Sequence, residues 1–377
     1  MRFELTADQQ MIEDQIKHFM RVEILPSVAD WDQDGLFEED ALQTIAELGM
    51  LGVNILEEFD GGEADVITLI RVLTEMAVVD ASLATMTAIQ NAFVVPHLML
   101  CGDVKEEILP AIATGEAWAT WVGPSSDFDD DESHYGLNLL SDEKGFYLDG
   151  SIPYLPMAET AQWFIGFAKT KEGDWRSFWV ENDSNIIKKP RTSSLGLRGV
   201  GGAEVQFSKV RLSSAQCPER KGGWSEQLKS IWRRGRIALA AVSLGIARAA
   251  LEEAIEYSKQ RRQFGKPLAA FQAIQWKIAN VAMQIDATRL TLDKAADAWQ
   301  KSDEVELEHY GRMARFMAAE LAIKSAQEAI QIHGGYGYTK EFPVERFYRD
   351  AQTLQAQWGG SDLERNNLAK DWFQSKI

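Results

Sequence analysis

The apolar residues of the first part of the chain recur every three or four positions, which is the spacing of an amphipathic helix. Three successive sets show this spacing: Ile12, Ile16 and Phe19; Ala41, Ile45 and Leu48; Ile70, Leu73 and Ala77. Thr6 precedes the first set, and Gln9 three residues later completes the pattern of a capping box. Residues 1–116 are therefore expected to form a helical domain.

The pattern changes to short alternating runs after Trp118. The clearest run extends from Val205 to Leu212, where apolar and polar residues alternate as in a half-buried strand. Shorter runs at 146–148 and 163–167 are separated by glycine-containing pairs that favour turns. Residues 117–222 are therefore expected to form a β-domain.

Helical spacing returns after Trp224. Ile237, Leu244 and Leu251 recur every seven residues with alanines between them, a seam that is typical of a bundle helix. The next helix is marked by Ile274, Ile278, Val281 and Ile285. Residues 223–377 are expected to form a C-terminal helical domain, which makes the fold class α+β.

Composition and charge exclude several classes of protein. The 377 residues, 45% of them hydrophobic, are enough for two or three domains. The net charge of −18 disfavours a nucleic-acid partner, because phosphates would be repelled. No apolar run is long enough to cross a bilayer, and the first residues do not look like a signal peptide, so we expect a cytoplasmic protein. Cys101 and Cys217 provide neither a disulfide framework nor a metal site.

The candidate chemistry lies near the C-terminus. An alanine-rich helical segment, 317–330, leads into Gln331-Ile332-His333-Gly334-Gly335-Tyr336-Gly337-Tyr338. Gly334 and Gly335 are expected to end the helix, because glycine adopts the left-handed conformation at little steric cost. The same glycines leave the backbone bare, so a ligand or another chain can approach closely.

Four stretches together resemble the acyl-CoA dehydrogenase flavoproteins, in that family's order along nearly the whole chain. The first stretch lies at the N-terminus, and the second is Leu195–Gly199. The third is Tyr257–Leu268, followed by Phe271-Gln272. The fourth is Gln331–Tyr338, which continues through Phe342–Arg346 and Arg349-Asp350 to Trp358–Asp362. The resemblance implies an N-terminal helical domain, a middle β-barrel or sandwich domain and a C-terminal four-helix bundle. It also implies FAD between the β-domain and the bundle, in a homodimer or homotetramer in which the adenine end reaches a neighbouring subunit.

The resemblance assigns two groups of flavin-binding residues. The dinucleotide end would be held by Arg261, Phe264, Gln272, Gln331, Gly334 and Gly335. The ring end would be held by Trp121, Val122, Tyr154, Pro156, Gly360 and Asp362. Members of the family normally carry threonines where this chain has Val122 and Pro156, so two hydroxyl contacts are missing and we expect FAD to be held less tightly than usual.

The catalytic base of the family is also missing. The glutamate that removes the α-proton of the thioester would stand at Trp358 or, in a minority of members, at Gly235 before Arg236. Indole cannot accept a proton, so no catalytic residue is assigned. Arg236, Trp358 and Gly359 are expected at the substrate.

Four interpretations follow from the missing base. A base could come from elsewhere, with Asp362, Glu364 and Tyr336 as candidates. The chemistry could instead be enoyl reduction or elimination, which we favour. The chain could be a non-catalytic subunit of a heteromeric enzyme, or a flavin-free binding or assembly protein. The implied partners are an acyl-CoA or acyl-carrier thioester and an electron-transfer flavoprotein.

Overall fold

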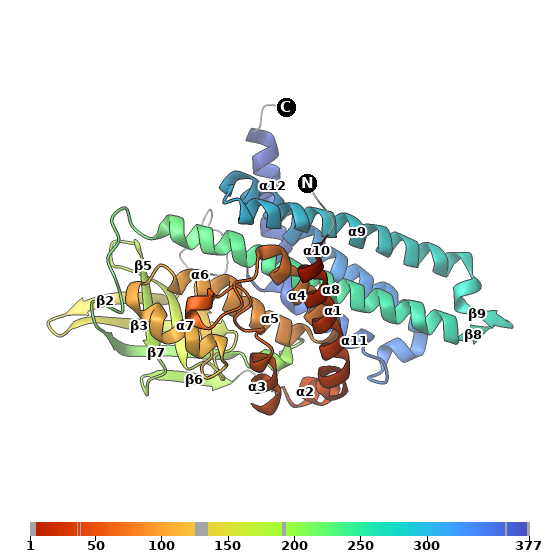
Figure 1. Ribbon diagram of the computed structural model, residues 1–377, viewed down its shortest axis with the longest axis horizontal. Coiled ribbons are helices and arrows are strands. Elements are labelled where there is room, and N and C mark those ends of the chain that lie inside the picture. The colour runs from red at the N-terminus through yellow and green to blue at the C-terminus, as the bar shows by residue number, and fades with distance from the viewer. Residues whose placement is uncertain are drawn as a thin grey trace.

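The computed structural model describes residues 5–35, 37, 39–124, 135–190, 194–358 and 360–374. Along the chain it forms a helical region, a β-sheet and a bundle of long helices (Figure 1). This is the α+β order that the hydrophobic pattern predicts.

The N-terminal region is helical, and its first helix begins at the predicted capping box. The Thr6 hydroxyl accepts from the Gln9 N–H at 3.2 Å, and the Thr6 N–H donates to Gln9 Oε1 at 2.9 Å. The α-helices are α1 (Ala7–Phe19), α2 (Val28–Asp34), α3 (Glu39–Glu47), α4 (Val66–Val79), α5 (Ala81–Ile89), α6 (Val95–Leu98) and α7 (Lys105–Ala113). Two π-helical turns, η1 (Met20–Ile24) and η4 (Gln90–Val94), and three 3-10 turns, η2 (Leu25–Ser27), η3 (Glu57–Phe59) and η5 (Gly102–Val104), interrupt them.

The middle region is one mixed sheet. Its strands are β1 (Ala119–Val122), β2 (Leu137–Asp142), β3 (Gly145–Leu155), β4 (Trp163–Lys169), β5 (Trp175–Glu181), β6 (Ile186–Pro190) and β7 (Ala203–Leu212). The order is β1-β4-β2-β3-β7-β6, with β5 paired to β4. β1 runs parallel to β4, and β7 shows the alternating burial that its sequence predicts.

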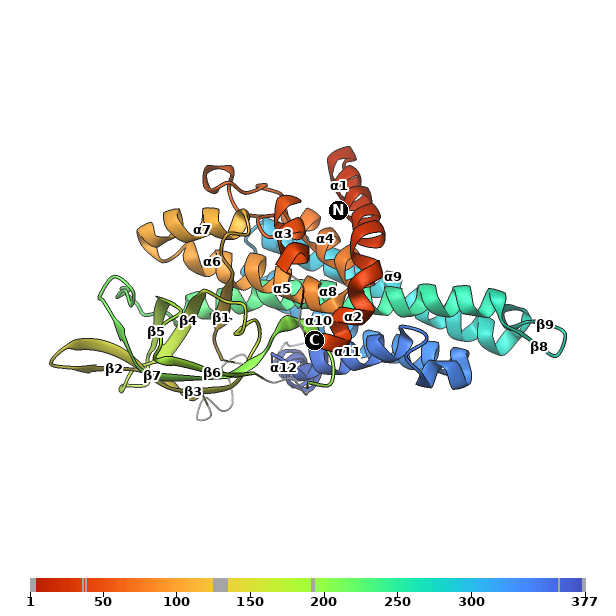
Figure 2. The ribbon, with the colours of Figure 1, turned by 90° about the horizontal axis from the view of Figure 1, so that it is seen from below.

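The C-terminal region is a bundle of long helices. They are α8 (Ser225–Gln260), α9 (Gln272–Gln300), α10 (Glu304–His333), α11 (Val344–Ala356) and α12 (Gly360–Gln374). Short 3-10 turns lie at η7 (Arg198–Val200), η8 (Leu268–Ala270) and η9 (Gly334–Tyr338). The hairpin of β8 (Arg262–Gln263) and β9 (Lys266–Pro267) projects from the end of the bundle that lies farthest from the sheet (Figures 1 and 2).

Two apolar cores hold these parts together. The larger joins the N-terminal helices to the bundle, and the smaller lies within the sheet. Helices α5, α6 and α7 lie on one side of the sheet (Figure 2), and the long helix α8 passes against α4 and α5. In the described part of the chain, no helix is both long and apolar enough to cross a membrane.

Candidate functional site

A hollow of about 540 Å3 opens where α8 and α10 end. Its lining includes Arg261, Gly334, Gly335 and Tyr336, which lie far apart in the sequence. Helix α10 stops at Gly334, whose φ of 61° and ψ of −129° suit glycine. A side chain at Gly335 would meet no other atom within 4 Å, so the backbone is open to a ligand here.

The Arg261 guanidinium provides a cation in this hollow, whose lining also includes Glu341. Arg261 caps α8, and its N–H donates to the Tyr257 carbonyl at 2.8 Å. The guanidinium lies 5.8 Å from the centre of the Tyr336 ring. Within the described ranges, no carboxylate forms an ion pair with it. A free guanidinium beside bare backbone suits an anion such as a pyrophosphate.

The β8–β9 hairpin beside the hollow presents an unusual aromatic residue. Its turn consists of Phe264 (φ 51°) and Gly265 (φ 79°), both in the left-handed region, as in the tight turns that match strand twist. Phe264 is 92% exposed. Its ring meets that of Phe271 edge to face, with 6.3 Å between the ring centres. A bulky, exposed residue with positive φ is an outlier, and it suggests a contact with another molecule. Gln272 and Gln331 are also exposed, at the start of α9 and near the end of α10.

Trp358 lies between α11 and α12 with a backbone φ of 52°. The buried guanidinium of Arg315 fixes this connection by donating to the carbonyls of Leu354 at 2.6 Å and Gln357 at 3.5 Å. Burial lowers the pKa of Arg315 to about 10, so the group remains charged. The Trp358 ring stacks on Phe93 from η4, with 6.3 Å between the ring centres.

Gly235 lies against the same phenylalanine. A Cβ atom at position 235 would be only 2.0 Å from the Phe93 ring, so no larger residue fits without a shift of that ring. The structure therefore brings together the two positions, 235 and 358, at which the resemblance places a base. Phe93 occupies space next to both of them.

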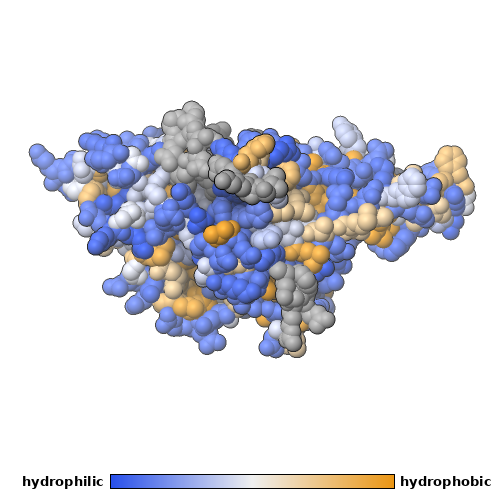
Figure 3. Space-filling view, turned by 90° about the horizontal axis from the view of Figure 1, so that it is seen from above, coloured by the Kyte–Doolittle hydropathy of each residue, from blue (hydrophilic) through white to orange (hydrophobic). Residues whose placement is uncertain are grey.

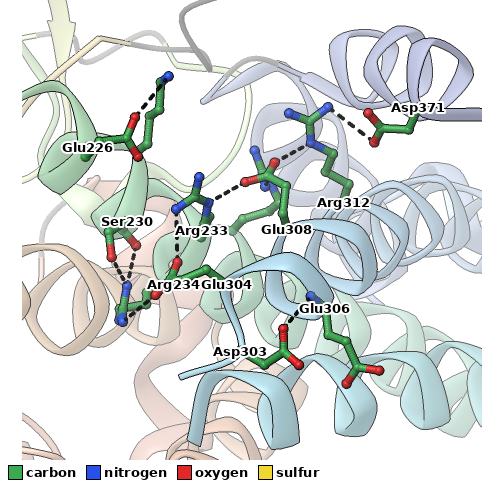
Figure 4. Close-up of polar contacts among 12 residues, drawn as sticks. Glu226, Ser230, Arg233, Arg234, Asp303, Glu304, Glu306, Glu308, Arg312 and Asp371 are labelled. Carbon is green, nitrogen blue, oxygen red and sulfur yellow. Dashed lines mark hydrogen bonds and ion pairs between the residues drawn. The ribbon is translucent and has the colours of Figure 1, made fainter. Parts of the chain in front are cut away.

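Arg236 is buried in an ion-pair network. Its Nε donates to Glu364 of α12 at 2.7 Å, and its Nη1 to Glu308 of α10 at 3.0 Å. In Figure 4, Glu308 also forms ion pairs with Arg233 and Arg312, and Arg312 forms an ion pair with Asp371. Burial alone would raise the pKa of Glu308, but these arginines hold it down at about 2. The network joins α8, α10 and α12.

The residues expected at the flavin ring differ from one another in their surroundings. Trp121 is buried, and its indole N–H donates to His97 Nδ1 at 3.3 Å. Val122 is buried within the core of the sheet. The Tyr154 ring fills the space above Gly202, where a Cβ would be 2.4 Å away. The Pro156 carbonyl accepts from the Thr120 hydroxyl at 2.6 Å.

The remaining expected residues lie near α12. Gly360 begins the helix with a φ of 67°, and the exposed side chain of Asp362 pairs with Arg365 at 3.1 Å. Glu364 is buried and engaged with Arg236, and Tyr336 lines the hollow. Gly359 lies outside the described residues.

Two of the resembling stretches contact each other directly. The Leu197 N–H donates to Asp350 Oδ1 at 2.7 Å, and the Gly196 N–H to the Thr353 hydroxyl at 2.9 Å. A Cβ at Gly196 would be 2.3 Å from the Arg349 backbone, so only glycine allows this approach. Burial raises the pKa of Asp350 to about 7. The Leu195–Gly199 stretch therefore holds α11, which ends just before Trp358.

Sequence reasoning missed Phe93, Trp232 and His97. None belongs to a recognisable motif, and Phe93 lies in a π-helical turn that breaks the helical spacing. The only signal was the density of aromatic residues, with 12 tryptophans in the chain.

The residues present fit FAD at its dinucleotide end. Arg261 and the Gly334-Gly335 backbone face one hollow, and a guanidinium next to backbone that carries no side chain matches a pyrophosphate. At the ring end the chain supplies fewer polar groups, since Val122 is buried in the sheet and Pro156 has no N–H. The fit is therefore clear for the dinucleotide and weaker for the ring.

Comparison with known proteins identifies the class of the chain. Residues 6–116 match the model of the acyl-CoA dehydrogenase N-terminal domain, and residues 221–373 match that of the C-terminal domain. The chain belongs to the acyl-CoA dehydrogenase family.

Individual relatives align along nearly their whole length. A probable acyl-CoA dehydrogenase of Bacillus subtilis is 31% identical, over 98% of this chain and 99% of its own. The butyryl-CoA dehydrogenase of Megasphaera elsdenii has the same fold, with a TM-score of 0.90 and 27% identity over 99% of this chain and 100% of that one. A glutaryl-coenzyme A dehydrogenase in complex with glutaryl-CoA gives a TM-score of 0.91 at 27% identity, over 99% of this chain and 97% of that one.

Proposed function

We propose that this protein is an FAD-dependent flavoprotein that acts on an acyl thioester by enoyl reduction or elimination instead of α,β-dehydrogenation. The observation that carries the proposal is the packing of Trp358 on Phe93, with Gly235 against the same ring. Both positions at which the family carries its base hold residues without a carboxylate. The Trp358 indole cannot accept a proton, and Gly235 has no side chain and lies against the Phe93 ring.

The proposed flavin site uses the hollow at the ends of α8 and α10. Arg261 would pair with the pyrophosphate, and the lack of side chains at Gly334 and Gly335 would let the pyrophosphate approach the backbone closely. FAD, when bound, supplies the two-electron redox chemistry that reduction of the α,β double bond of an enoyl thioester requires. Arg315 would hold the Gln357-Trp358 connection in place at the substrate side.

The proposed assembly is a homodimer or homotetramer in which a second copy completes the flavin site. Besides Phe264, helix α9 carries a stripe of exposed apolar residues at seven-residue spacing, Trp276, Met283 and Leu290. Such spacing suits packing against another helix. Apolar surface lies over the bundle half of the molecule and at the tip with the hairpin (Figure 3). An electron-transfer flavoprotein is the proposed redox partner.

A second candidate function is a non-catalytic subunit that pairs with an active homologue. The engagement of Arg236 favours it, because the guanidinium is 1% exposed and already bound to Glu308 and Glu364. In this role the chain would contribute its hollow and hairpin to a shared flavin site.

The first test is the absorption spectrum of the purified protein. A flavin band is expected, and a colourless protein that takes up no added FAD would contradict both functions. The second test is to reduce the protein with dithionite under anaerobic conditions and add enoyl-CoA thioesters. Reoxidation of the flavin by an enoyl-CoA is expected of a reductase, while a non-catalytic subunit would stay reduced.

A further inference from the structure

His333 is the last residue of α10 and belongs to the lining of the hollow that we propose for FAD. Its side chain is buried, and two rings hold the imidazole. The Tyr257 ring stacks on it with 4.0 Å between the ring centres, and the Phe342 ring meets it edge to face at 5.0 Å. The Tyr257 hydroxyl also donates to the His333 carbonyl at 3.2 Å. The imidazole is therefore fixed in orientation, although the resemblance assigns it no role.

Both ring nitrogens of His333 lie next to hydrogen-bond acceptors. Nδ1 is 2.8 Å from the Ala329 carbonyl, which can only accept, so Nδ1 carries a proton. Nε2 is 3.9 Å from Glu253 Oε1 on α8, and among the described residues it has no hydrogen-bond partner. In a neutral ring this buried Nε2 meets no donor. The surroundings thus supply an acceptor for each N–H of an imidazolium ring.

Two further features of this position suit a positively charged ring. Helix α10 ends at His333, and a cation in the last turn interacts favourably with the partly negative end of a helix. The Tyr257 ring lies nearly parallel to the imidazole, with 25° between the planes, and the face of an aromatic ring attracts cations. In the described part of the chain, no lysine or arginine forms an ion pair with Glu253, so this carboxylate is available to His333.

The charge of the hollow shows what a second cation would contribute. Arg261 is the only arginine or lysine among the described residues of its lining, and Glu341 opposes it. The partly negative ends of α8 and α10 meet at the same place. A doubly charged pyrophosphate is therefore poorly matched by Arg261 alone. An imidazolium at His333 would add a cation that is screened little, because the ring is buried.

We propose that His333 is a further cofactor-binding residue, which takes up a proton at Nε2 when the pyrophosphate of FAD enters the hollow. The proposal rests on the proposed function, because it takes this hollow to hold FAD. The proton comes from the solvent, and no covalent bond of the cofactor changes. Because binding and protonation are linked, the affinity for FAD should fall as the pH rises.

His333 is the group that suits this proton uptake. Histidine is the type of side chain whose charge ordinarily changes between about pH 5 and pH 8. The other charged or titratable groups around the ring come from α8 and from the segment after α10: Glu253, Tyr257, Arg261, Tyr336 and Glu341. Glu253 also borders a second hollow of about 310 Å3, whose charged lining consists of Arg21, Glu252, Glu256 and Arg346.

The experiment is fluorescence titration of the full-length protein, freed of flavin, with FAD between pH 6 and pH 8. In the unchanged protein the dissociation constant should rise by about tenfold over this range, which is within the usual coupling between linked sites. In His333→Gln it should stay near the high-pH value throughout, because glutamine cannot take up a proton. His309→Gln is the matched control, since this histidine of the same helix does not line the hollow and should keep the pH dependence.

A second measurement detects the proton itself. Calorimetric titration with FAD at pH 7, in two buffers of different ionisation enthalpy, gives the number of protons taken up on binding. The unchanged protein should take up more than His333→Gln. If His333→Gln fails to fold, His333→Phe keeps a ring against Tyr257 and should lose the pH dependence in the same way.

The outcomes separate the two proposals. If the unchanged protein binds FAD equally tightly across the pH range, or if His333→Gln keeps the same pH dependence and proton uptake, His333 does not take up the proton, although the FAD site stands. An equal loss of affinity in His333→Gln at every pH would show a purely structural role and would also overturn the proposal. If the unchanged protein binds no FAD at any pH, the proposed function itself is wrong and the role of His333 falls with it.

Discussion

Trp358 combines two properties that seldom occur together at a residue without function. Its φ of 52° is costly for a bulky side chain, and strain of this kind is typical of functional sites. Its ring also stacks on Phe93, and the carbonyl of the preceding residue is held by Arg315. The surrounding structure thus maintains an unfavourable conformation at the position where the resemblance places the base.

Replacing this tryptophan should restore the missing chemistry. Trp358→Glu introduces a carboxylate and removes the ring, and general-base catalysis contributes about 10²–10⁴-fold. We expect the variant to reduce its flavin with a short saturated acyl-CoA at a rate higher by about that factor than the unchanged protein. The measurement is loss of the oxidised flavin band on anaerobic mixing.

The control for this change is Trp358→Gln. It opens the same space and keeps a similar shape but cannot accept the α-proton, so it should remain inactive. Equal activity in both variants would show that space, and not a base, was limiting. Rapid bleaching of the unchanged protein by a saturated acyl-CoA would show that a base exists elsewhere.

At this scale the departures from the family at Trp358 and Gly235 stay a prediction from the resemblance, and the sequence did not predict what surrounds these residues. The absence of a carboxylate at 358 and 235 can be read from a motif. The contact of both positions with Phe93 joins segments that are distant in sequence, and local spacing does not encode it. The role of Arg236 at the substrate stays a prediction, and its ion pairs with Glu308 and Glu364 depend on how three helices pack.

Among the elements, the ends of α8 and α10 carry the proposed FAD site. Arg261→Ala should weaken FAD binding by about tenfold to a hundredfold, because a hydrogen bond to a charged group is worth about 1.5–3 kcal/mol. The flavin-to-protein absorbance ratio after gel filtration measures the loss. Arg262→Ala is the matched control, since this exposed neighbour on β8 does not line the hollow. Full flavin retention in Arg261→Ala would count against the site.

The contact between the Leu195–Gly199 stretch and α11 should make stability depend on pH. Burial raises the pKa of Asp350 from 3.8 to about 7, so the folded state holds this proton more tightly than the unfolded state. The stability due to protonated Asp350 is complete below pH 4 and is lost as the pH rises through 7. At about 1.36 kcal/mol per pKa unit, the full loss is about 4 kcal/mol.

Asp350→Asn tests this pH dependence. Asparagine cannot ionise, and its side-chain oxygen can still accept the Leu197 N–H. The free energy of unfolding of the unchanged protein should therefore fall relative to that of the variant between pH 4 and pH 8, as measured by urea denaturation. Asp286→Asn, at a largely exposed carboxylate on α9, should run parallel to the unchanged protein. A constant difference between Asp350→Asn and the unchanged protein would exclude the proposed titration.

The regular elements could be predicted because each carries a local signal. The capping box at Thr6, the alternating run of β7, the heptad spacing of α8 and the glycine stop of α10 are all confirmed. The π-helical turn that carries Phe93 could not be predicted, because one extra residue in a turn leaves no periodic signal in the sequence. The parallel pairing of β1 with β4 also depends on distant partners.

For the whole molecule, the proposed assembly depends on the apolar stripe of α9. Trp276→Glu places a charge in the middle of a surface that we expect to pack against a second copy, so it should shift the protein towards monomer. Sedimentation velocity at micromolar concentration measures the shift. Val305→Glu is the control, because Val305 is 80% exposed but lies outside the stripe. A stable monomer of the unchanged protein would refute the assembly.

The exposed Phe264 hairpin has a consequence for handling the protein in dilute solution. If a second copy covers the hairpin and completes the flavin site, loss of that copy on dilution removes part of the cofactor's binding surface. Binding equilibria then obey mass action, and cofactor occupancy becomes a function of protein concentration. A colourless sample obtained at nanomolar concentration would thus report dissociation of the subunits and not an inability to bind FAD.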